Sequence, residues 1–176
     1  MGGIDETRPF RALAIAVLTV SDSRSPAEDR SGTVLADAIV AAGHRLAARD
    51  LVPDEEQAIV AVLRDWIADP RISVILTTGG TGVTARDVTP EAVRTVLEKE
   101  IPGFGELFRW QSYAKIGTST IQSRALGGIA GGTYIFALPG SPSACRDAWD
   151  GILVHQLDSR YRPCNFVELL PRLAGK

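Results

Sequence analysis

Cysteine, histidine and excess positive charge are all scarce in this 176-residue chain. Its two cysteines, Cys145 and Cys164, have the spacing of neither a zinc site nor a C-x-x-C redox pair. The two histidines, His44 and His155, stand alone in the sequence, and neither is assigned a catalytic role. The net charge is −2, from 19 basic and 21 acidic residues, which argues against a nucleic-acid-binding protein. We therefore expect a cytoplasmic protein with two reduced thiols.

Long apolar runs are also missing, and no stretch is long enough to span a membrane. Residues 1–10 contain Asp5, Glu6 and Pro9 and no apolar region of a signal peptide, so they are predicted to form a flexible N-terminal arm. Residues 11–170 are long enough to bury a sizeable core and are predicted to be one domain. Residues 171–176 are predicted to be a tail.

Strand and helix patterns alternate along the chain. Residues 13–20 form an apolar run, as expected for a strand that is covered on both faces. Further strands are predicted at 46–51, 72–77 and 133–138. Helices are predicted at 34–43, 55–68, 89–100 and 104–111, and from Pro142 onward, whereas residues 117–132 are expected to be irregular. This order predicts a three-layer α/β/α domain with a mostly parallel sheet.

A glycine-rich loop, TGGTG at 78–82, follows the strand predicted at 72–77. Glycines have no Cβ, so several N–H groups of such a loop can point into one concavity that suits a phosphate. Thr89 is predicted to cap the next helix, with Pro90 at its first position, and the helix N-terminus adds partial positive charge. The loop lacks the lysine of a P-loop and the spacing of a dinucleotide fingerprint. A tight turn that binds no ligand stays an alternative.

Two aspartates are candidates for chemistry. Asp87 lies between the glycine loop and the helix, where a carboxylate is out of place unless a cation joins it, so we interpret the segment as a phosphate site with a divalent metal. The alternative is a loop aspartate that bonds its own backbone. For Asp54 the pattern alone favours an N-cap of the helix at 55–68, because Asp54 and Gln57 fit a capping box.

Loops that follow parallel strands are expected to meet at one edge of the sheet. Residues 21–29, 78–87 and 139–141 each follow a predicted strand, and ligands of open α/β sheets bind at such carboxyl ends. Each loop also has an ordinary interpretation. Asp22 is a common turn former, and Ser141 followed by proline is a common N-cap.

Several motifs resemble one known family. They are VLTVSDSR (17–24), EDRSG (28–32), LVPDEEQAI (51–59), VILTTGGTGVTARDVTPEA (74–92), PGFGELFR (102–109), GTSTIQSRA (117–125), FALPGSPSAC (136–145) and RPCNF (162–166). In this order they resemble the molybdenum-cofactor biosynthesis domain shared by bacterial molybdopterin adenylyltransferases, bacterial cofactor-biosynthesis protein B and the N-terminal domain of gephyrin. The resemblance covers residues 13–166, and its last motif indicates the protein B branch.

The resemblance implies a molybdopterin-binding-domain fold and a specific reaction. That reaction is the Mg²⁺-dependent adenylylation of molybdopterin by ATP, which yields adenylylated molybdopterin and pyrophosphate. Asp54 and Asp87 are implied to be catalytic and to hold the Mg²⁺. Arg124 could bind phosphate or pterin through its planar fork. The candidate residues for binding molybdopterin and ATP are Ser21, Asp22, Asp29, Thr78, Gly79, Gly80, Thr81, Gly82, Ser123, Arg124, Pro139, Gly140 and Ser141.

A non-catalytic binding module is the main alternative, because the protein B branch contains members that resemble a degenerate enzyme. The presence of both Asp54 and Asp87 favours activity. A scaffold role like that of gephyrin is disfavoured, because it depends on additional domains. The family's members assemble as trimers or pairs of trimers, so a homotrimer or hexamer is expected, with residues 104–113 as a candidate contact. No nucleic-acid or membrane partner is expected.

Overall fold

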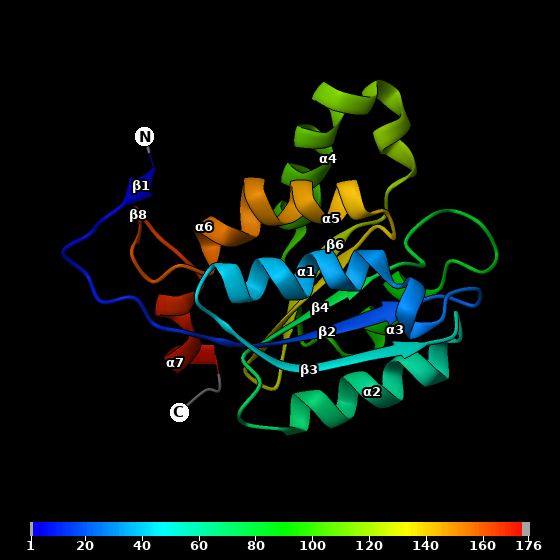
Figure 1. Cartoon of the computed structure of the whole chain (residues 1–176), viewed down its shortest axis with the longest axis horizontal. Helices are drawn as coiled ribbons and strands as arrows, with labels where there is room; N and C mark the ends of the chain where they lie inside the picture. Colours follow the sequence, from blue (N-terminus) through cyan, green and yellow to red (C-terminus); the bar gives the residue numbers. More distant parts are fainter. Residues whose placement is uncertain (1, 174–176) are drawn as a thin grey trace.

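A six-stranded sheet lies at the centre of the computed structural model, which describes residues 2–173 (Figure 1). The strand order is β3-β2-β4-β7-β6-β5. The parallel strands are β3 (Arg45–Val52), β2 (Ala14–Val20), β4 (Val74–Thr78) and β7 (Thr133–Leu138). The antiparallel pairs join β6 (Leu126–Ala130) to β7 and β5 (Lys99–Glu100) to β6. The predicted α/β domain with a mostly parallel sheet is confirmed.

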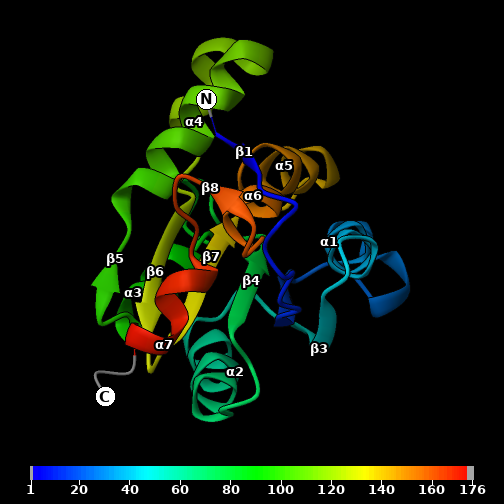
Figure 2. The same cartoon turned by 90° about the vertical axis from the view of Figure 1, so that its left-hand side faces the viewer.

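Helices cover both faces of this sheet (Figure 2). Helices α1 (Arg30–Ala41), α4 (Pro102–Ile116) and α5 (Pro142–Ala148) pack on one face, and α2 (Glu56–Ala68) and α3 (Thr89–Val96) pack on the other. The alternation of side chains along β2 explains the layering. Ile15 and Val17 belong to the first core cluster, whereas Ala16 and Leu18 belong to the second.

Shorter elements complete the chain. They are β1 (Gly3–Ile4), the 3₁₀ turns η1 (Pro26–Glu28), η2 (Gly117–Gln122) and η4 (Val167–Leu169), the π turn η3 (Trp149–Leu153), α6 (Val154–Gln156), β8 (Tyr161–Arg162) and α7 (Leu170–Leu173). No helix in residues 2–173 is both long enough and apolar enough to cross a membrane.

Two secondary-structure predictions were wrong in the segment between α3 and β7. The helix predicted at 89–100 ends at Val96, because the backbone of Leu97 is extended and the N–H of Glu98 donates to the carbonyl oxygen of Ile129 at 2.8 Å. The segment predicted to be irregular contains η2 and β6. Its glycines serve packing: a Cβ on Gly127 would lie 2.7 Å from the ring of Phe136.

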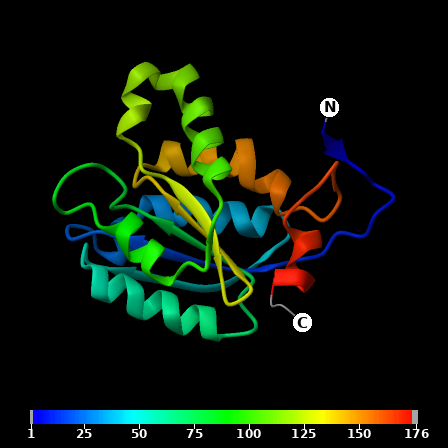
Figure 3. The same ribbon diagram turned by 180° about the vertical axis from the view of Figure 1, so that it is seen from behind.

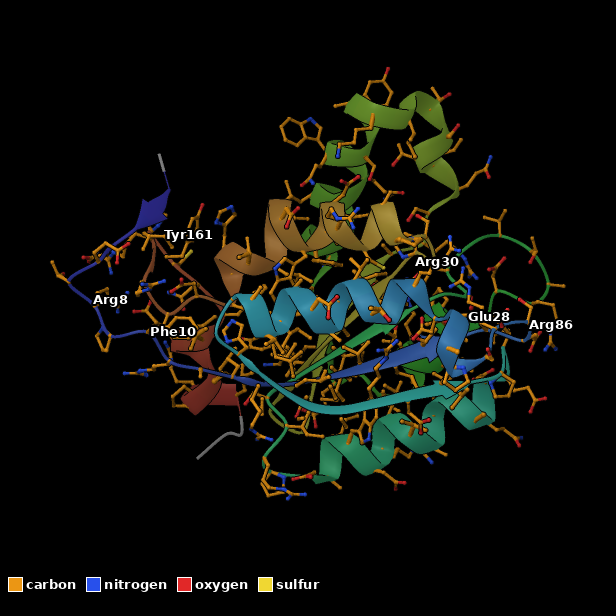
Figure 4. All side chains as sticks on the ribbon, in the orientation of Figure 1. Arg8, Phe10, Glu28, Arg30, Arg86 and Tyr161 are labelled. Carbon is orange, nitrogen blue, oxygen red and sulfur yellow. The ribbon has the colours of Figure 1, made fainter. Side chains whose placement is uncertain are left out.

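The N-terminal residues contact the C-terminal part of the chain. Strand β1 pairs with β8, and the guanidinium carbon of Arg160 lies 5.2 Å from the centroid of the Phe10 ring. Figure 4 shows Arg8, Phe10 and Tyr161 at one end of the molecule and Arg86 at the other. The flexibility of the arm at 1–10 stays a prediction. Of the predicted tail at 171–176, residues 174–176 lie outside the described residues.

The register of the parallel strands brings their carboxyl ends together. Thr19 of β2 lies beside Thr78 of β4, which in turn lies beside Leu138 of β7, while Val20 lies beside Val52 of β3. The loops that leave these strands therefore share one edge of the sheet, where the loop after β4 projects from the domain (Figure 3).

Candidate active site

The glycine loop is shaped by close backbone contacts between neighbouring strands. Gly79 has φ +105°, and a Cβ on it would lie 2.1 Å from the carbonyl oxygen of Val20. A Cβ on Gly140, in the loop after β7, would lie 3.1 Å from the Cα of Gly79. Only glycine fits this conformation and these contacts, so the glycines fix where the loop turns away from β4.

Thr89 holds the first half of the loop. Its hydroxyl donates to the carbonyl oxygen of Gly79 at 2.8 Å, and its N–H donates to the carbonyl oxygen of Gly80 at 3.0 Å. The prediction that Thr89 caps α3 was wrong, because the N-cap is Val88 and Thr89 is the first residue of the helix. The hydroxyl is fully buried and serves the loop instead.

Arg124 holds the second half of the loop. Its N–H donates to the carbonyl oxygen of Thr81 at 3.0 Å, and its Nε donates to the carbonyl oxygen of Gly82 at 2.6 Å. Its remaining nitrogens contact Glu91 and the carbonyl oxygen of Asp87. The guanidinium thus bonds protein groups behind the loop, and the role predicted for Arg124 in binding phosphate or pterin stays a prediction.

The N–H groups of the loop are used differently from its carbonyl groups. The N–H of Gly79 donates to Leu138, but within residues 2–173 the N–H groups of Gly80 and Thr81 donate to no protein acceptor. All four carbonyl oxygens of Gly79–Gly82 are bonded to Thr89 or Arg124. The loop therefore presents donors and withholds acceptors, which is the arrangement that an anion requires.

Two carboxylates lie against this loop. A Cβ on Gly80 would be 2.9 Å from Oδ1 of Asp54, and a Cβ on Gly82 would be 2.8 Å from Oδ2 of Asp87. Asp54 comes from the loop after β3 and Asp87 from the loop after β4. The fold thus brings together two carboxylates that are 33 residues apart in the sequence. The capping box predicted for Asp54 was wrong: Glu55 is the N-cap of α2, and it makes no side-chain cap bond.

The environments of the two carboxylates push their pKa values in opposite directions. Burial raises the pKa of Asp54; the N–H of Asp22 opposes this shift, and the negative charges of Asp22 and Asp87 add to it. Burial also raises the pKa of Asp87, but hydrogen bonds from Thr84 and Gly82 outweigh it and leave the pKa below its ordinary value. The N–H and hydroxyl of Thr84 donate to Oδ2 of Asp87 at 2.8 and 2.6 Å. Asp87 therefore bonds its own loop, as the alternative interpretation expected, and it also lies at the candidate site.

A cleft of about 650 Å³ opens over the loop and the two carboxylates. It collects eleven of the predicted site residues from five separate segments of the chain. They are Ser21, Asp54, Gly79, Gly80, Thr81, Gly82, Asp87, Ser123, Pro139, Gly140 and Ser141.

Comparison with known proteins identifies the family of this chain. The family described as "Probable molybdopterin binding domain" matches residues 16–159. This chain belongs to that family. Molybdenum cofactor biosynthesis protein B of Escherichia coli K12 is 49% identical over 157 residues, which are 89% of this chain and 92% of the relative. The resemblance seen in the motifs is confirmed.

Solved structures of the molybdopterin-binding domain family share the fold. A crystal structure of molybdenum cofactor biosynthesis protein B superposes with a TM-score of 0.86 at 35% identity, covering 96% of this chain and all of the other. The tungsten cofactor synthesizing protein MoaB of Pyrococcus furiosus gives a TM-score of 0.77 at 30% identity, covering 93% and 98%. The likeness extends through both faces of the sheet and is not confined to the glycine loop.

Four predicted site residues of this family member do not line the cleft. Thr78 is buried, and its hydroxyl donates to the carbonyl oxygen of Pro139 at 2.9 Å. Asp29 is also buried, and it caps α1 through the N–H of Gly32 at 2.8 Å. Asp22 and Arg124 bond residues of the cleft from outside it. These four side chains support the loops of the molybdopterin-binding domain.

The sequence reasoning missed Arg24, which lines the cleft. Both terminal nitrogens of its guanidinium donate to the carbonyl oxygen of Gly140, at 3.2 and 3.1 Å. Arg24 thereby ties the loop after β2 to the loop after β7. The available signal was its place in a loop that follows a parallel strand. Gln122 and Arg86 also line the cleft.

The carboxylates of this family member fit Mg²⁺ in one particular mode. Within the described residues there is no group of three or more histidine, cysteine, aspartate or glutamate side chains that could hold a metal. Asp54 and Asp87 alone face the loop that offers free N–H donors. Mg²⁺ is commonly held by one or two carboxylates, with phosphate oxygens and water completing its shell. The pair suits that mode and not an all-protein cage.

Proposed function

We propose that this protein acts in molybdenum cofactor biosynthesis by adenylylating molybdopterin with ATP, with release of pyrophosphate. The observation that carries the proposal is that two carboxylates from different loops lie against the glycine loop, which has free N–H donors. The donors of Gly80 and Thr81 suit phosphate oxygens, whereas Asp54 and Asp87 would repel them unless a cation is bound between. Nucleotide and metal together resolve this conflict of charge. The cytoplasm, where Cys145 and Cys164 stay reduced, is the proposed compartment.

In this reaction the protein would position the two substrates and neutralise the charge of their phosphates. The terminal phosphate of molybdopterin attacks the α-phosphorus of ATP, the bond to the β-phosphate oxygen breaks, and pyrophosphate leaves. An ionised phosphate needs no general base, so none is assigned. The N–H groups of Gly80 and Thr81 bind phosphate oxygens, and the guanidinium of Arg24 adds positive charge to the cleft. Asp54 and Asp87 would hold Mg²⁺, which supplies charge stabilisation on the attacking and leaving oxygens.

Turnover should depend strictly on Mg²⁺. Without the cation, two carboxylates face the triphosphate across the glycine loop, so chelation of the metal is expected to abolish product formation. The measurement is the amount of adenylylated molybdopterin formed from purified protein, molybdopterin and ATP, with Mg²⁺ and with EDTA. Equal rates in the two conditions would refute the metal's role.

A non-catalytic molybdopterin- or nucleotide-binding module is the second candidate. Two observations favour it. The chain has the RPCNF motif at 162–166, and its relatives are named molybdenum cofactor biosynthesis protein B. The same assay separates the two functions. Molybdopterin binding without adenylylated product would establish the module.

We also propose that the protein assembles as a homotrimer or hexamer through the face formed by α4 and η2. This region stands out from the rest of the domain (Figure 1). Phe104 and Phe108 are core residues, but large apolar side chains of the same region are exposed: Leu107, Trp110, Tyr113, Ile116 and Ile121. Trp110 is 76% exposed, and exposed apolar patches commonly mark protein interfaces.

Replacing Trp110 with lysine is expected to dissociate the assembly, because it puts a charge into the apolar contact. Sedimentation velocity of the wild type and of Trp110→Lys measures the change. Val40→Lys is the matched control, since Val40 is 60% exposed on α1, outside the α4–η2 face. An unchanged mass for Trp110→Lys, or a monomeric wild type, would contradict the proposal.

A further inference from the structure

We propose that Asp22 is a positioning residue that sets the orientation of the Asp54 carboxylate. The two residues bond each other reciprocally. The N–H of Asp22 donates to Oδ2 of Asp54 at 2.9 Å, and the N–H of Asp54 donates to Oδ1 of Asp22 at 3.0 Å. This closed pair joins the loop after β2 to the loop after β3. The inference rests on the proposed function, in which Asp54 binds Mg²⁺.

The reciprocal pair fixes which oxygen of Asp54 faces the cleft. Oδ2 is engaged by Asp22, whereas Oδ1 lies over Gly80, 2.9 Å from the position of an added Cβ. Among the described residues, Asp22 is the only hydrogen-bond partner of the Asp54 side chain. Asp54 also receives no anchoring from a helix cap, because Glu55 is the N-cap of α2. Its orientation therefore depends on Asp22.

Arg86 holds Asp22 from a third loop. Its Nε and one terminal nitrogen both donate to Oδ2 of Asp22, at 2.9 and 2.6 Å. Arg86 immediately precedes Asp87, so the contact links the two cleft carboxylates through one chain of bonds: Asp54, Asp22, Arg86 and the Asp87 backbone. Arg86 lies at the loop end of the molecule in Figure 4.

Stability does not account for this contact. The side chains of Arg86 and Asp22 are 62% and 41% exposed, and exposed ion pairs add little to folding. What the pair does supply is geometry, because each of the three loops leaves a different strand of the sheet. Residues that orient a metal ligand from outside the site typically change metal affinity or activity by about 10–100-fold when they are replaced.

Asp22→Ala is expected to lower kcat by roughly 10–100-fold, with little change in the KM for ATP. The replacement removes the acceptor for the Asp54 N–H and the partner of Arg86, but no side chain that lines the cleft. Asp22→Asn keeps an acceptor for that N–H and should restore part of the activity. If Asp22 acts through Asp54, Asp22→Ala added to Asp54→Asn should cost no further activity. Multiplying effects would overturn the proposal.

Asp69→Ala is the matched control. Asp69 accepts the N–H of Arg71 at 2.9 Å and pairs with the guanidinium of the same residue, so it makes the same kinds of contact as Asp22. Asp69 follows the C-terminal end of α2, whereas Asp54 precedes the N-terminal end of that helix. Wild-type kcat is expected for Asp69→Ala. An equal loss in the two variants would show that Asp22→Ala acts through general stability, which contradicts a positioning role.

Metal binding gives a readout that does not depend on turnover. Titration calorimetry of Mg²⁺ into the 176-residue protein with a non-hydrolysable ATP analogue should show a Kd about 10-fold weaker or more for Asp22→Ala than for the wild type. If the wild type forms no adenylylated product but this difference is seen, the proposed reaction fails and the positioning role stands. If the wild type turns over and Asp22→Ala matches it in both kcat and Mg²⁺ affinity, the positioning role alone fails.

Discussion

Asp87→Asn is expected to lower kcat by about 100-fold or more, while molybdopterin binding survives. The magnitude is that of removing one preorganised group that stabilises a transition state. The amide preserves the shape of the side chain and a bond to Thr84, but it removes the negative charge that Mg²⁺ requires beside Gly82. In the proposed mechanism Asp87 holds the metal and does not bind the pterin, so affinity for molybdopterin should change little.

Steady-state kinetics and equilibrium binding of molybdopterin together check this expectation. Asp65→Asn is the control, because Asp65 is exposed on α2 and makes no side-chain hydrogen bond within the described residues. Wild-type turnover in Asp87→Asn would show that the assigned role is wrong. Parallel loss of turnover and of molybdopterin binding would instead indicate a collapsed loop.

Gly80→Ala is expected to lower activity by about 100-fold or more, because the new methyl group would collide with the Asp54 carboxylate and the Thr89 hydroxyl. A Cβ at this position would lie 2.5 Å from Oγ1 of Thr89 and 2.9 Å from Oδ1 of Asp54. It would displace the carboxylate and break the hydroxyl contact that holds the carbonyl oxygen of Gly79. Backbone strain adds to this, since Gly80 has φ +62°.

Gly117→Ala separates strain from displacement. Gly117 has a similar φ of +58°, but a Cβ there would meet nothing within 4 Å. Both variants should lose unfolding free energy through backbone strain, about 1–2 kcal/mol or more, and Gly80→Ala also loses the contact of the Thr89 hydroxyl; urea denaturation measures both losses. Only Gly80→Ala should lose turnover. Similar activity in the two variants would contradict the placement of Asp54 over the loop.

The sequence was sufficient to predict the main frame of the site, because that frame depends on local patterns. The apolar runs at β2, β4 and β7 predicted parallel strands, and loops after parallel strands meet at one edge of a sheet. The TGGTG segment predicted a loop that offers donors, and the structure places its free N–H groups beside Asp54 and Asp87.

The errors arose where distant residues decide the outcome. Thr89 looked like a helix cap, yet its hydroxyl bonds the loop that precedes the helix. Strand β6 looked irregular because of its glycines, whose lack of side chains makes room for Phe136 and Leu97. No local pattern contains these contacts, since each joins separate segments.

The pair formed by Asp22 and Asp54 shows the same limit. Each residue alone fits an ordinary local interpretation, a turn former for Asp22 and a helix cap for Asp54. Their reciprocal bonds exist only because the register of β2 and β3 sets Val20 beside Val52. Sequence reasoning named Asp22 as a candidate site residue, but the positioning role proposed for it rests on these bonds.

Transfer of label from ATP tests the central claim most directly. Purified protein is mixed with molybdopterin, Mg²⁺ and ATP labelled at the α-phosphorus, and the products are separated and counted. The account predicts that the label enters the pterin product, with one unlabelled pyrophosphate released for each molecule formed. Label that stays in ATP while molybdopterin binds, or that leaves as free AMP, would contradict adenylyl transfer at this site.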